Sequence, residues 1–167
     1  MDYRHDRRLL MLSVRIICVG KLKEKYLKEG IDEYAKRLSR FCKFEIIEVS
    51  EELCNDLSAK NIQNVKTCEG ERLISKLKGY CIALDLKGKM LTSRQISDKI
   101  SSLKQNGMST VSFVIGGSHG LSQELLDKCD FSICFGAITY PHQLIRLVLT
   151  EQIYRAFMIE EGSAYHK

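Results

Sequence analysis

Five short apolar segments alternate with segments of helical periodicity along this 167-residue chain, and this alternation limits the fold more than any other feature. The apolar segments are rich in β-branched residues and stop at turn residues, as buried strands do. Between them, apolar side chains recur every three or four positions among charged ones, which predicts amphipathic helices. We expect strands at 13–19, 44–49, 81–86, 111–115 and 131–135, and helices at 23–40, 62–77, after Thr92, after Ser122, and from Pro141 to 160. This order predicts a single α/β domain whose parallel-type sheet is flanked by helices on both faces.

Local signals refine the outline between these elements. Thr92 and Gln95 have the spacing of a capping box. Residues 87–89 (Lys-Gly-Lys) are expected to turn the chain after the third strand, and 51–61 is polar enough to be a loop. Gly70 weakens the second helix, because glycine is a poor helix former.

The composition excludes several classes of protein. Hydrophobic residues make up 44% of the chain and charged residues 28%, close to the globular average, so the sequence predicts neither disorder nor a membrane protein. No apolar run approaches the roughly 18 residues of a spanning helix. Arg15 interrupts the apolar start, and no cleavage site for a signal peptide follows it. The seven cysteines show no metal-binding or paired spacing, which favours a reducing, cytoplasmic location and no metal.

The formal net charge of +5 permits an RNA partner without requiring one. The basic residues are spread along the sequence and form no single tract. Charge therefore does not separate an RNA-modifying enzyme from a protein that only binds RNA.

The ends of the strands are the first places to search for a ligand site in a parallel sheet. Gly116, Gly117 and Gly120 follow the fourth strand and precede a helix, so a ligand could approach the backbone closely there. They form neither a dinucleotide fingerprint nor a Walker loop, and a plain structural turn is an equally good interpretation. The segment 135–140 contains small residues beside apolar ones and could hold a flat ring, although an ordinary connection is the simpler interpretation.

The last helix, from Pro141 to about Glu160, carries apolar residues nearly all round. It is expected to be capped by Thr139 or Tyr140 and to end at Gly162. A helix buried on several sides needs several partner surfaces, which we expect to be its own sheet and a second copy of the chain.

Polar side chains on and beside this helix are candidates for a site, each with a simpler alternative. Glu151 and Arg155 have the i,i+4 spacing of an ordinary ion pair. His142 at the helix start is ambiguous. Tyr165-His166-Lys167 is expected to be a free tail with a composition suited to RNA, or a disordered end without function.

Four motifs carry a resemblance to a known family: Phe113-Val-Ile-Gly-Gly-x-x-Gly120, Thr139-x-Pro-His-Gln-Leu144, Glu151-Gln-x-Tyr-Arg-Ala156 and Gly162-x-x-Tyr-His-Lys167. In this order they resemble the SPOUT-class ribosomal RNA large subunit methyltransferase H family, over residues 11–167. The resemblance implies a homodimer with a C-terminal trefoil knot that uses S-adenosylmethionine to methylate N3 of a pseudouridine in 23S ribosomal RNA of the large subunit. Residues 1–10 have no counterpart in it and are expected to be a disordered or foreign extension.

The resemblance also implies a set of site residues. The cofactor would contact Leu84 after the third strand, Gly116 and Gly117 in the glycine loop, and Phe135, Gly136, Ala137, Ile138, Thr139 and Tyr140. The catalytic hypotheses are that His166 or Tyr165, with Lys167, closes over the target base, and that Arg155 or His142 orients the RNA or the helix start. The departures from the family pattern, at Gly136, Ile138, Tyr140 and Ala164, bear on cofactor contacts and on the rigidity of the tail.

Two other functions stay open on the residues alone. One is a nucleotide- or NAD-binding enzyme that uses the glycine loop for phosphate, although the acidic residue expected after such a fingerprint is missing. The other is a non-catalytic RNA-binding or ribosome-assembly protein. Binding of S-adenosylmethionine would distinguish them.

Overall fold

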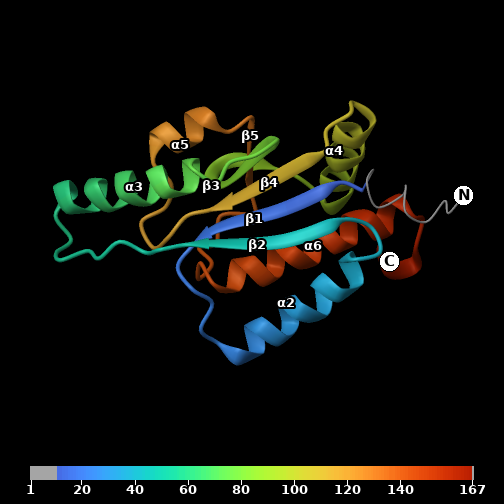
Figure 1. The fold of residues 1–167 in the computed structure, drawn as a ribbon, viewed down its shortest axis with the longest axis horizontal. Coiled ribbons are helices and arrows are strands. Elements are labelled where there is room, and N and C mark those ends of the chain that lie inside the picture. Colours follow the sequence, from blue (N-terminus) through green and yellow to red (C-terminus); the bar gives the residue numbers. More distant parts are fainter. Residues whose placement is uncertain (1–10, 167) are drawn as a thin grey trace, which may run out of the picture.

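The computed structural model describes residues 11–166, so the predictions about residues 1–10 and Lys167 lie outside it. Its centre is a five-stranded sheet in the order β2-β1-β4-β3-β5, and every pair of neighbours is parallel (Figure 1). The strands are β1 (Ser13–Val19), β2 (Lys43–Val49), β3 (Tyr80–Met90), β4 (Thr110–Ile115) and β5 (Phe131–Cys134). The predicted parallel α/β fold is therefore confirmed.

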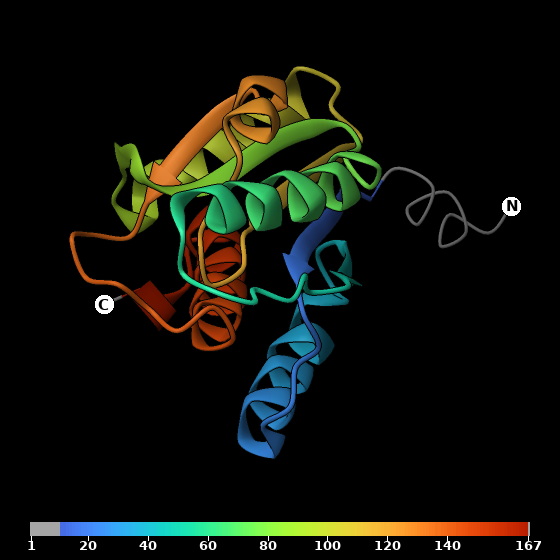
Figure 2. The ribbon, with the colours of Figure 1, turned by 90° about the vertical axis from the view of Figure 1, so that its left-hand side faces the viewer.

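Helices cover both faces of the sheet, and two apolar cores lie between the layers (Figures 1 and 2). The helices are α2 (Lys25–Leu38), α3 (Ala59–Ile74), α4 (Ser93–Gln105), α5 (Gln123–Lys128), α6 (Leu144–Glu160) and the short 3-10 helix η1 (Ala164–His166). Side chains of α2, α4 and α6 share the larger core, and those of α3 and α5 share the smaller one. Successive residues of β1 alternate between the two cores because strand side chains point to opposite faces.

Several predicted helix ends are confirmed. Thr92 accepts from the Gln95 backbone N–H while the Gln95 side chain accepts from the Thr92 N–H, which completes the capping box. The Ser122 hydroxyl caps α5 through the Leu125 N–H. After α6, Gly162 has a φ of 68°, a left-handed conformation that glycine adopts without strain, and its N–H donates to the Ile159 carbonyl.

The predicted start of the last helix is wrong by three residues. α6 begins at Leu144, its N-cap residue is Gln143, and neither Thr139 nor Tyr140 caps it. The Pro141 carbonyl accepts from the Ile145 N–H at 3.0 Å, so a turn leads into the helix. The Gln143 side chain accepts from the backbone N–H of Lys23, 120 positions earlier, which a local capping rule cannot foresee.

The predicted turn at 87–89 is also corrected. β3 continues to Met90, but Leu84 and Lys89 both pair with Ile133, so residues 85–88 leave the ladder as a bulge. A Cβ at Gly88 would lie 2.6 Å from the Ile133 backbone carbon, so only glycine permits this approach. The chain makes an excursion without reversing its direction.

α6 has three neighbours within one chain: the sheet beneath it, and α2 and α4 on its two sides. These contacts explain most of its apolar character, part of which the sequence assigned to a second copy. Within residues 11–166, no helix is long and apolar enough to cross a membrane. The trefoil knot implied by the resemblance stays a prediction, because strand order does not define how the chain threads.

Candidate functional site

The β3 bulge and the loops after β4 and β5 meet in one cavity of about 860 Å³ at the carboxyl edge of the sheet, the edge that faces the viewer in Figure 2. This volume is within the range of about 300–1,000 Å³ of small-molecule and cofactor sites. The expected cofactor residues that line the cavity are Leu84, Gly116, Gly117, Phe135, Gly136, Ile138, Thr139 and Tyr140. Ala137 is not among the lining residues. The strand-end segments singled out in the sequence therefore line one cavity.

The glycine loop after β4 is a tight turn in its own right. Gly117 and Gly120 form an isolated bridge, and the Gly120 N–H donates to the Gly117 carbonyl at 3.1 Å. A Cβ at Gly116 would lie 2.8 Å from the Gly120 backbone. The loop is therefore a structural turn, and its residues also line the cavity, as a ligand loop would.

A buried carboxyl group, which the sequence did not single out, supports the glycine loop from behind. Glu69 of α3 is 2% exposed, and its Oε1 accepts from the Glu52 N–H at 3.1 Å. Its Oε2 has no hydrogen-bond partner within residues 11–166 and lies 2.7 Å from the position of a Cβ on Gly117. Burial raises the pKa of Glu69. No pattern in the sequence separates this glutamate from the other acids of its helix.

The segment after β5 forms a wall of the cavity. Gly136 has a φ of 105°, and no heavy atom lies within 4 Å of the place of a Cβ there. The Cys134 thiol donates to the Gly136 carbonyl at 3.0 Å and helps to hold the bend. Ile138 is 71% exposed, so an apolar side chain stands free at this wall.

His142, which follows this wall, also lines the cavity. Burial, and then the positive charge of Arg146, lower the pKa of His142. At neutral pH its imidazole is therefore uncharged, with one ring nitrogen able to accept a proton.

Arg146, one turn into α6, is 1% exposed. Its guanidinium donates to Glu48 Oε1 at 3.1 Å and to the Val19 carbonyl. Glu48 also accepts from the Leu22 N–H at 2.8 Å. In the sequence, Arg146 is one of the polar residues that interrupt the apolar surface of the helix, with Glu151, Gln152 and Arg155. Its partners come from distant strands.

The C-terminal tail is docked against its own chain, so the expectation of a free tail is wrong. The Tyr165 hydroxyl donates to Glu151 Oε1 at 3.1 Å, and the Tyr165 ring meets Tyr154 edge-on at 5.1 Å between centroids. Arg155 forms the predicted ion pair with Glu151 at 2.6 Å and lies over the Tyr165 ring. This clustering of aromatic rings around an ion pair holds the tail on α6.

Among residues 11–166, no candidate catalytic residue of the tail lines the cavity of its own chain. Arg155, Tyr165 and the exposed His166 are absent from the lining, and Lys167 lies outside the described residues. Burial, together with the hydrogen bonds to Tyr34 and Glu151, raises the pKa of Tyr165. The phenol therefore stays protonated at neutral pH and acts as a donor.

Thiols and metal-binding groups do not gather at the cavity. All seven cysteines are unpaired, and burial raises the pKa of the Cys18 thiol to about 11, as expected for a cysteine that acts as a small hydrophobe. Within residues 11–166, no three His, Cys, Asp or Glu side chains are grouped as metal ligands.

Comparison with known proteins gives the family. Residues 12–166 match the family described as predicted SPOUT methyltransferase. The chain belongs to this family. It is 53% identical over 159 residues to ribosomal RNA large subunit methyltransferase H of Pediococcus pentosaceus, and 52% identical over 159 residues to that of Alkaliphilus oremlandii. Each match covers 93% of this chain and the whole of the relative.

A solved structure shares the fold of this chain. A probable methylase family protein from Haemophilus influenzae superposes with a TM-score of 0.51 at 12% identity, over 93% of this chain and 71% of that protein. At this identity the likeness concerns the fold alone.

Proposed function

We propose that this SPOUT family member uses S-adenosylmethionine to methylate N3 of a pseudouridine in 23S ribosomal RNA. The cavity built by the β3 bulge and the loops after β4 and β5 carries the proposal, because it lies where parallel sheets bind ligands. The relatives that match along the chain are named ribosomal RNA large subunit methyltransferase H. The nature of the RNA substrate comes from those names, and the nucleotide from the family resemblance.

The cavity suits a nucleoside-containing cofactor. Leu84, Ile115 and Phe135 offer apolar surface for an adenine ring, and Gly136 leaves open space beside the backbone. Asp85 contributes a carboxylate to the lining, which would favour a cationic sulfonium group. S-Adenosylmethionine would supply an electrophilic methyl group. The protein's task is then to hold the N3 nitrogen in line with that group and to exclude water.

The proton on N3 has to leave as the N–C bond forms. His142 lines the cavity in its neutral form, so its free ring nitrogen can accept that proton. The Tyr165 O–H, which donates to Glu151 in this structure, could donate to a carbonyl oxygen of the base once it leaves that partner. His166 is exposed and available, and Arg155 would orient the RNA or the tail.

A homodimer would bring the separated parts of the site together. The tail of one chain is docked on its own α6 and does not line its own cavity. α6 also presents the half-buried side chains of Leu147, Val148 and Tyr154. We infer that a second copy covers this helix and lends its tail to the cavity, and sedimentation should give the mass of two chains. A cytoplasmic location follows from a ribosomal substrate and unpaired thiols.

Calorimetric titration with S-adenosylmethionine, NAD and ATP tests the proposal. We expect saturable binding of S-adenosylmethionine alone, near one per chain, and transfer of its labelled methyl group to 23S ribosomal RNA. Thr139→Tyr should weaken this binding at least ten-fold, because Thr139 is an exposed residue of the cavity wall where a ring can enter without moving the backbone. Gly116→Val is unsuitable, since its side chain would meet the Gly120 backbone.

Ser109→Tyr is the matched control, because Ser109 is exposed and precedes β4 at the opposite edge of the sheet. Binding of NAD or ATP in place of S-adenosylmethionine would favour the nucleotide enzyme. Binding of none of the three, with RNA binding retained, would favour the non-catalytic RNA-binding protein.

A further inference from the structure

One side of the cavity carries two lysines and a histidine, and none of the expected cofactor residues belongs to it. Lys66 of α3, Lys87 of the β3 bulge and His119 of the glycine loop all line the same cavity as Phe135 and Thr139. Their elements are separate in the sequence, so no single motif predicts that they meet. The fold gathers them, and in each case a glycine makes the approach possible.

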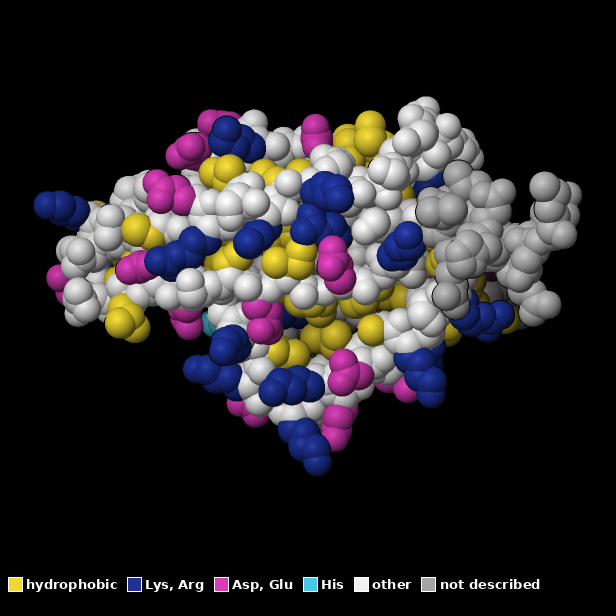
Figure 3. Space-filling view, in the orientation of Figure 1, with side chains coloured by type: hydrophobic (Ala, Val, Ile, Leu, Met, Phe, Trp, Pro, Cys, Tyr) yellow, Lys and Arg dark blue, Asp and Glu magenta, His cyan; other side chains and the backbone are white. Residues whose placement is uncertain are grey.

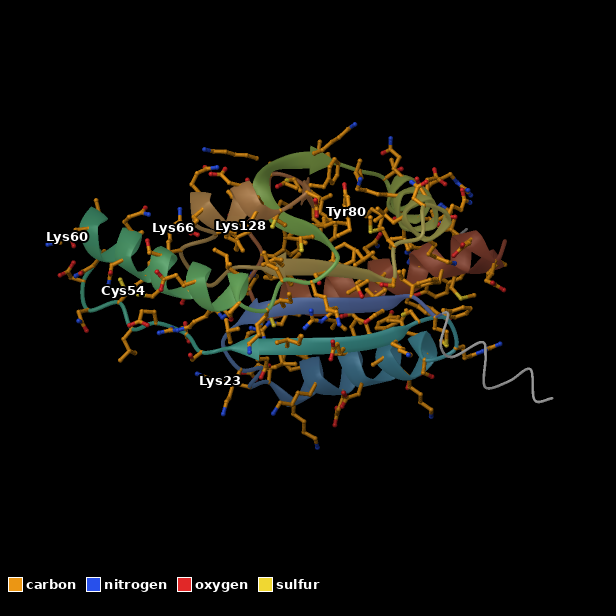
Figure 4. All side chains as sticks on the ribbon, turned by 45° about the horizontal axis from the view of Figure 1, so that its top comes forward. Lys23, Cys54, Lys60, Lys66, Tyr80 and Lys128 are labelled. Carbon is orange, nitrogen blue, oxygen red and sulfur yellow. The ribbon has the colours of Figure 1, made fainter. Side chains whose placement is uncertain are left out.

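Lys66 reaches the cavity because α3 packs closely against the start of α5. A Cβ at Gly70 would lie 2.3 Å from the Ser122 hydroxyl oxygen, so the two helices touch backbone to side chain there. Lys66 lies one turn before Gly70 on the same face of the helix. It is half-buried, whereas Lys60 nearer the start of α3 is exposed. Figure 4 marks Lys66 on the part of α3 nearer to α5 and Lys60 at the far end of the helix.

Lys87 and His119 are presented by two backbone turns. The Lys87 N–H donates to Asp85 Oδ2 at 3.2 Å, and the bulge is held against Ile133 by the close approach of Gly88. His119 lies between Gly117 and Gly120, whose backbones are bridged. Turns restrained in this way hold their side chains at the cavity with little further loss of entropy on binding.

The face drawn in Figure 3 carries mixed charges. Lysines and arginines on the face drawn in Figure 3 are interspersed with acids, which agrees with the spread of basic residues along the sequence. The basic side chains that line the cavity differ from this mixed surface because they can surround one ligand. An anionic ligand group would fit them best.

We propose that Lys66, Lys87 and His119 form a subsite for a backbone phosphate of the RNA strand that carries the target nucleotide. This inference rests on the proposed function and adds to it the place where the strand is held. Lys87 is exposed and Lys66 half-buried, so a macromolecule can reach both from solvent. The carboxylate of the cofactor is the other source of an anion, and the test distinguishes the two.

The experiment compares Lys66→Gln with the wild-type chain in two titrations. Binding to 23S ribosomal RNA that contains its pseudouridines is measured between 50 and 200 mM salt, roughly the range in which phosphate contacts are resolved. Loss of one contact should weaken binding about five- to ten-fold at 0.1 M salt and reduce the slope of log K against log salt by about 0.7–0.9. Binding of S-adenosylmethionine should not change.

Two further variants control the measurement. Lys60→Gln removes the same charge from the same helix outside the cavity, and should change the salt slope much less. Lys66→Arg keeps the charge and should keep most of the affinity for RNA.

Two results would overturn the subsite. Weaker binding of S-adenosylmethionine with an unchanged salt slope for RNA would assign Lys66 to the cofactor's carboxylate. Equal effects of Lys66→Gln and Lys60→Gln would make Lys66 an ordinary solvated lysine. If the wild-type chain bound no S-adenosylmethionine, the proposed function would fail, but the RNA titrations would still decide the subsite.

Discussion

The burial of Glu69 determines how its carboxyl group titrates and how it affects the stability of the fold. Its carboxyl group is buried behind the glycine loop, and burial raises its pKa. A carboxyl group whose folded-state pKa is raised contributes stability that is fully present below the unfolded pKa of about 4.3 and is lost as pH rises through the folded pKa. At neutral pH, ionised Glu69 therefore costs stability.

Glu69→Gln should remove this pH dependence. The amide keeps an oxygen for the Glu52 N–H and carries no charge at any pH. The melting temperature of the variant, relative to that of the wild type, should therefore rise between pH 5 and 8. Thermal unfolding at several pH values measures the difference, and about 2–4 °C corresponds to 1 kcal/mol in a chain of this size. Glu71→Gln, an exposed change two residues away, is the control. Parallel pH profiles for the three proteins would contradict the prediction.

At the scale of elements, Gly70 shows why a helix can contain a residue that weakens it. Alanine at this position should gain about 1 kcal/mol of helix propensity. Its Cβ would instead lie 2.3 Å from the Ser122 hydroxyl oxygen, inside any normal contact distance. Gly70→Ala should therefore lower the free energy of unfolding, by about 1–3 kcal/mol as for other overpacked sites.

A second substitution tests the cause of this loss. Ser122→Gly removes the opposing atoms and, as an N-cap change, costs only a few tenths of a kcal/mol. In the Ser122→Gly background, Gly70→Ala should lower the free energy of unfolding much less. Urea unfolding of the wild type, the two single variants and the double variant gives the coupling energy. An equal cost of Gly70→Ala in both backgrounds would exclude the contact with Ser122 as the reason.

Sequence rules were accurate for elements wherever the signal was local. The β-branched runs predicted all five strands, and the capping box at Thr92 and the cap at Ser122 are present as expected. The errors lie where distant residues compete. Gln143 pairs with the β1–α2 loop, the β3 bulge depends on Ile133, and the tail is held by Glu151 and Tyr154. Local propensity contains none of this information.

At the scale of the whole molecule, the candidate site could be located but not assembled from the sequence. The strand-end rule placed the glycine loop and the segment 135–140 at one edge, and both line the cavity. Lys66 and Glu69 could not be foreseen, because the place of α3 at this edge depends on its packing against α5 and the sheet. Sheet order, which no sequence pattern states, decides which loops become neighbours.

Arg146 joins the first and last thirds of the chain, and its removal is the test at this scale. It lies in α6 and donates to Glu48 at the end of β2 and to the Val19 carbonyl at the end of β1. Arg146→Met would keep an apolar stem but leave the buried Val19 carbonyl without this charged donor. The Glu48 side chain that remains is 33% exposed, so the cost comes mainly from the two lost hydrogen bonds of the guanidinium. At about 1.5 kcal/mol or more for each hydrogen bond to a charged group, the loss should be about 3 kcal/mol.

The melting temperature should therefore fall by roughly 6–12 °C, at about 2–4 °C per kcal/mol. Lys25→Met is the matched control, because Lys25 and Glu29 form an ion pair with side chains 89% and 65% exposed, and such pairs contribute little. Arg146 also lies one turn from His142, so its loss should loosen the wall of the cavity. Calorimetric titration of the same variant should then show weaker binding of the cofactor. If Arg146→Met melted no lower than Lys25→Met, the link between α6 and the strand ends would not hold the fold together, and the position of the cavity wall would need another cause.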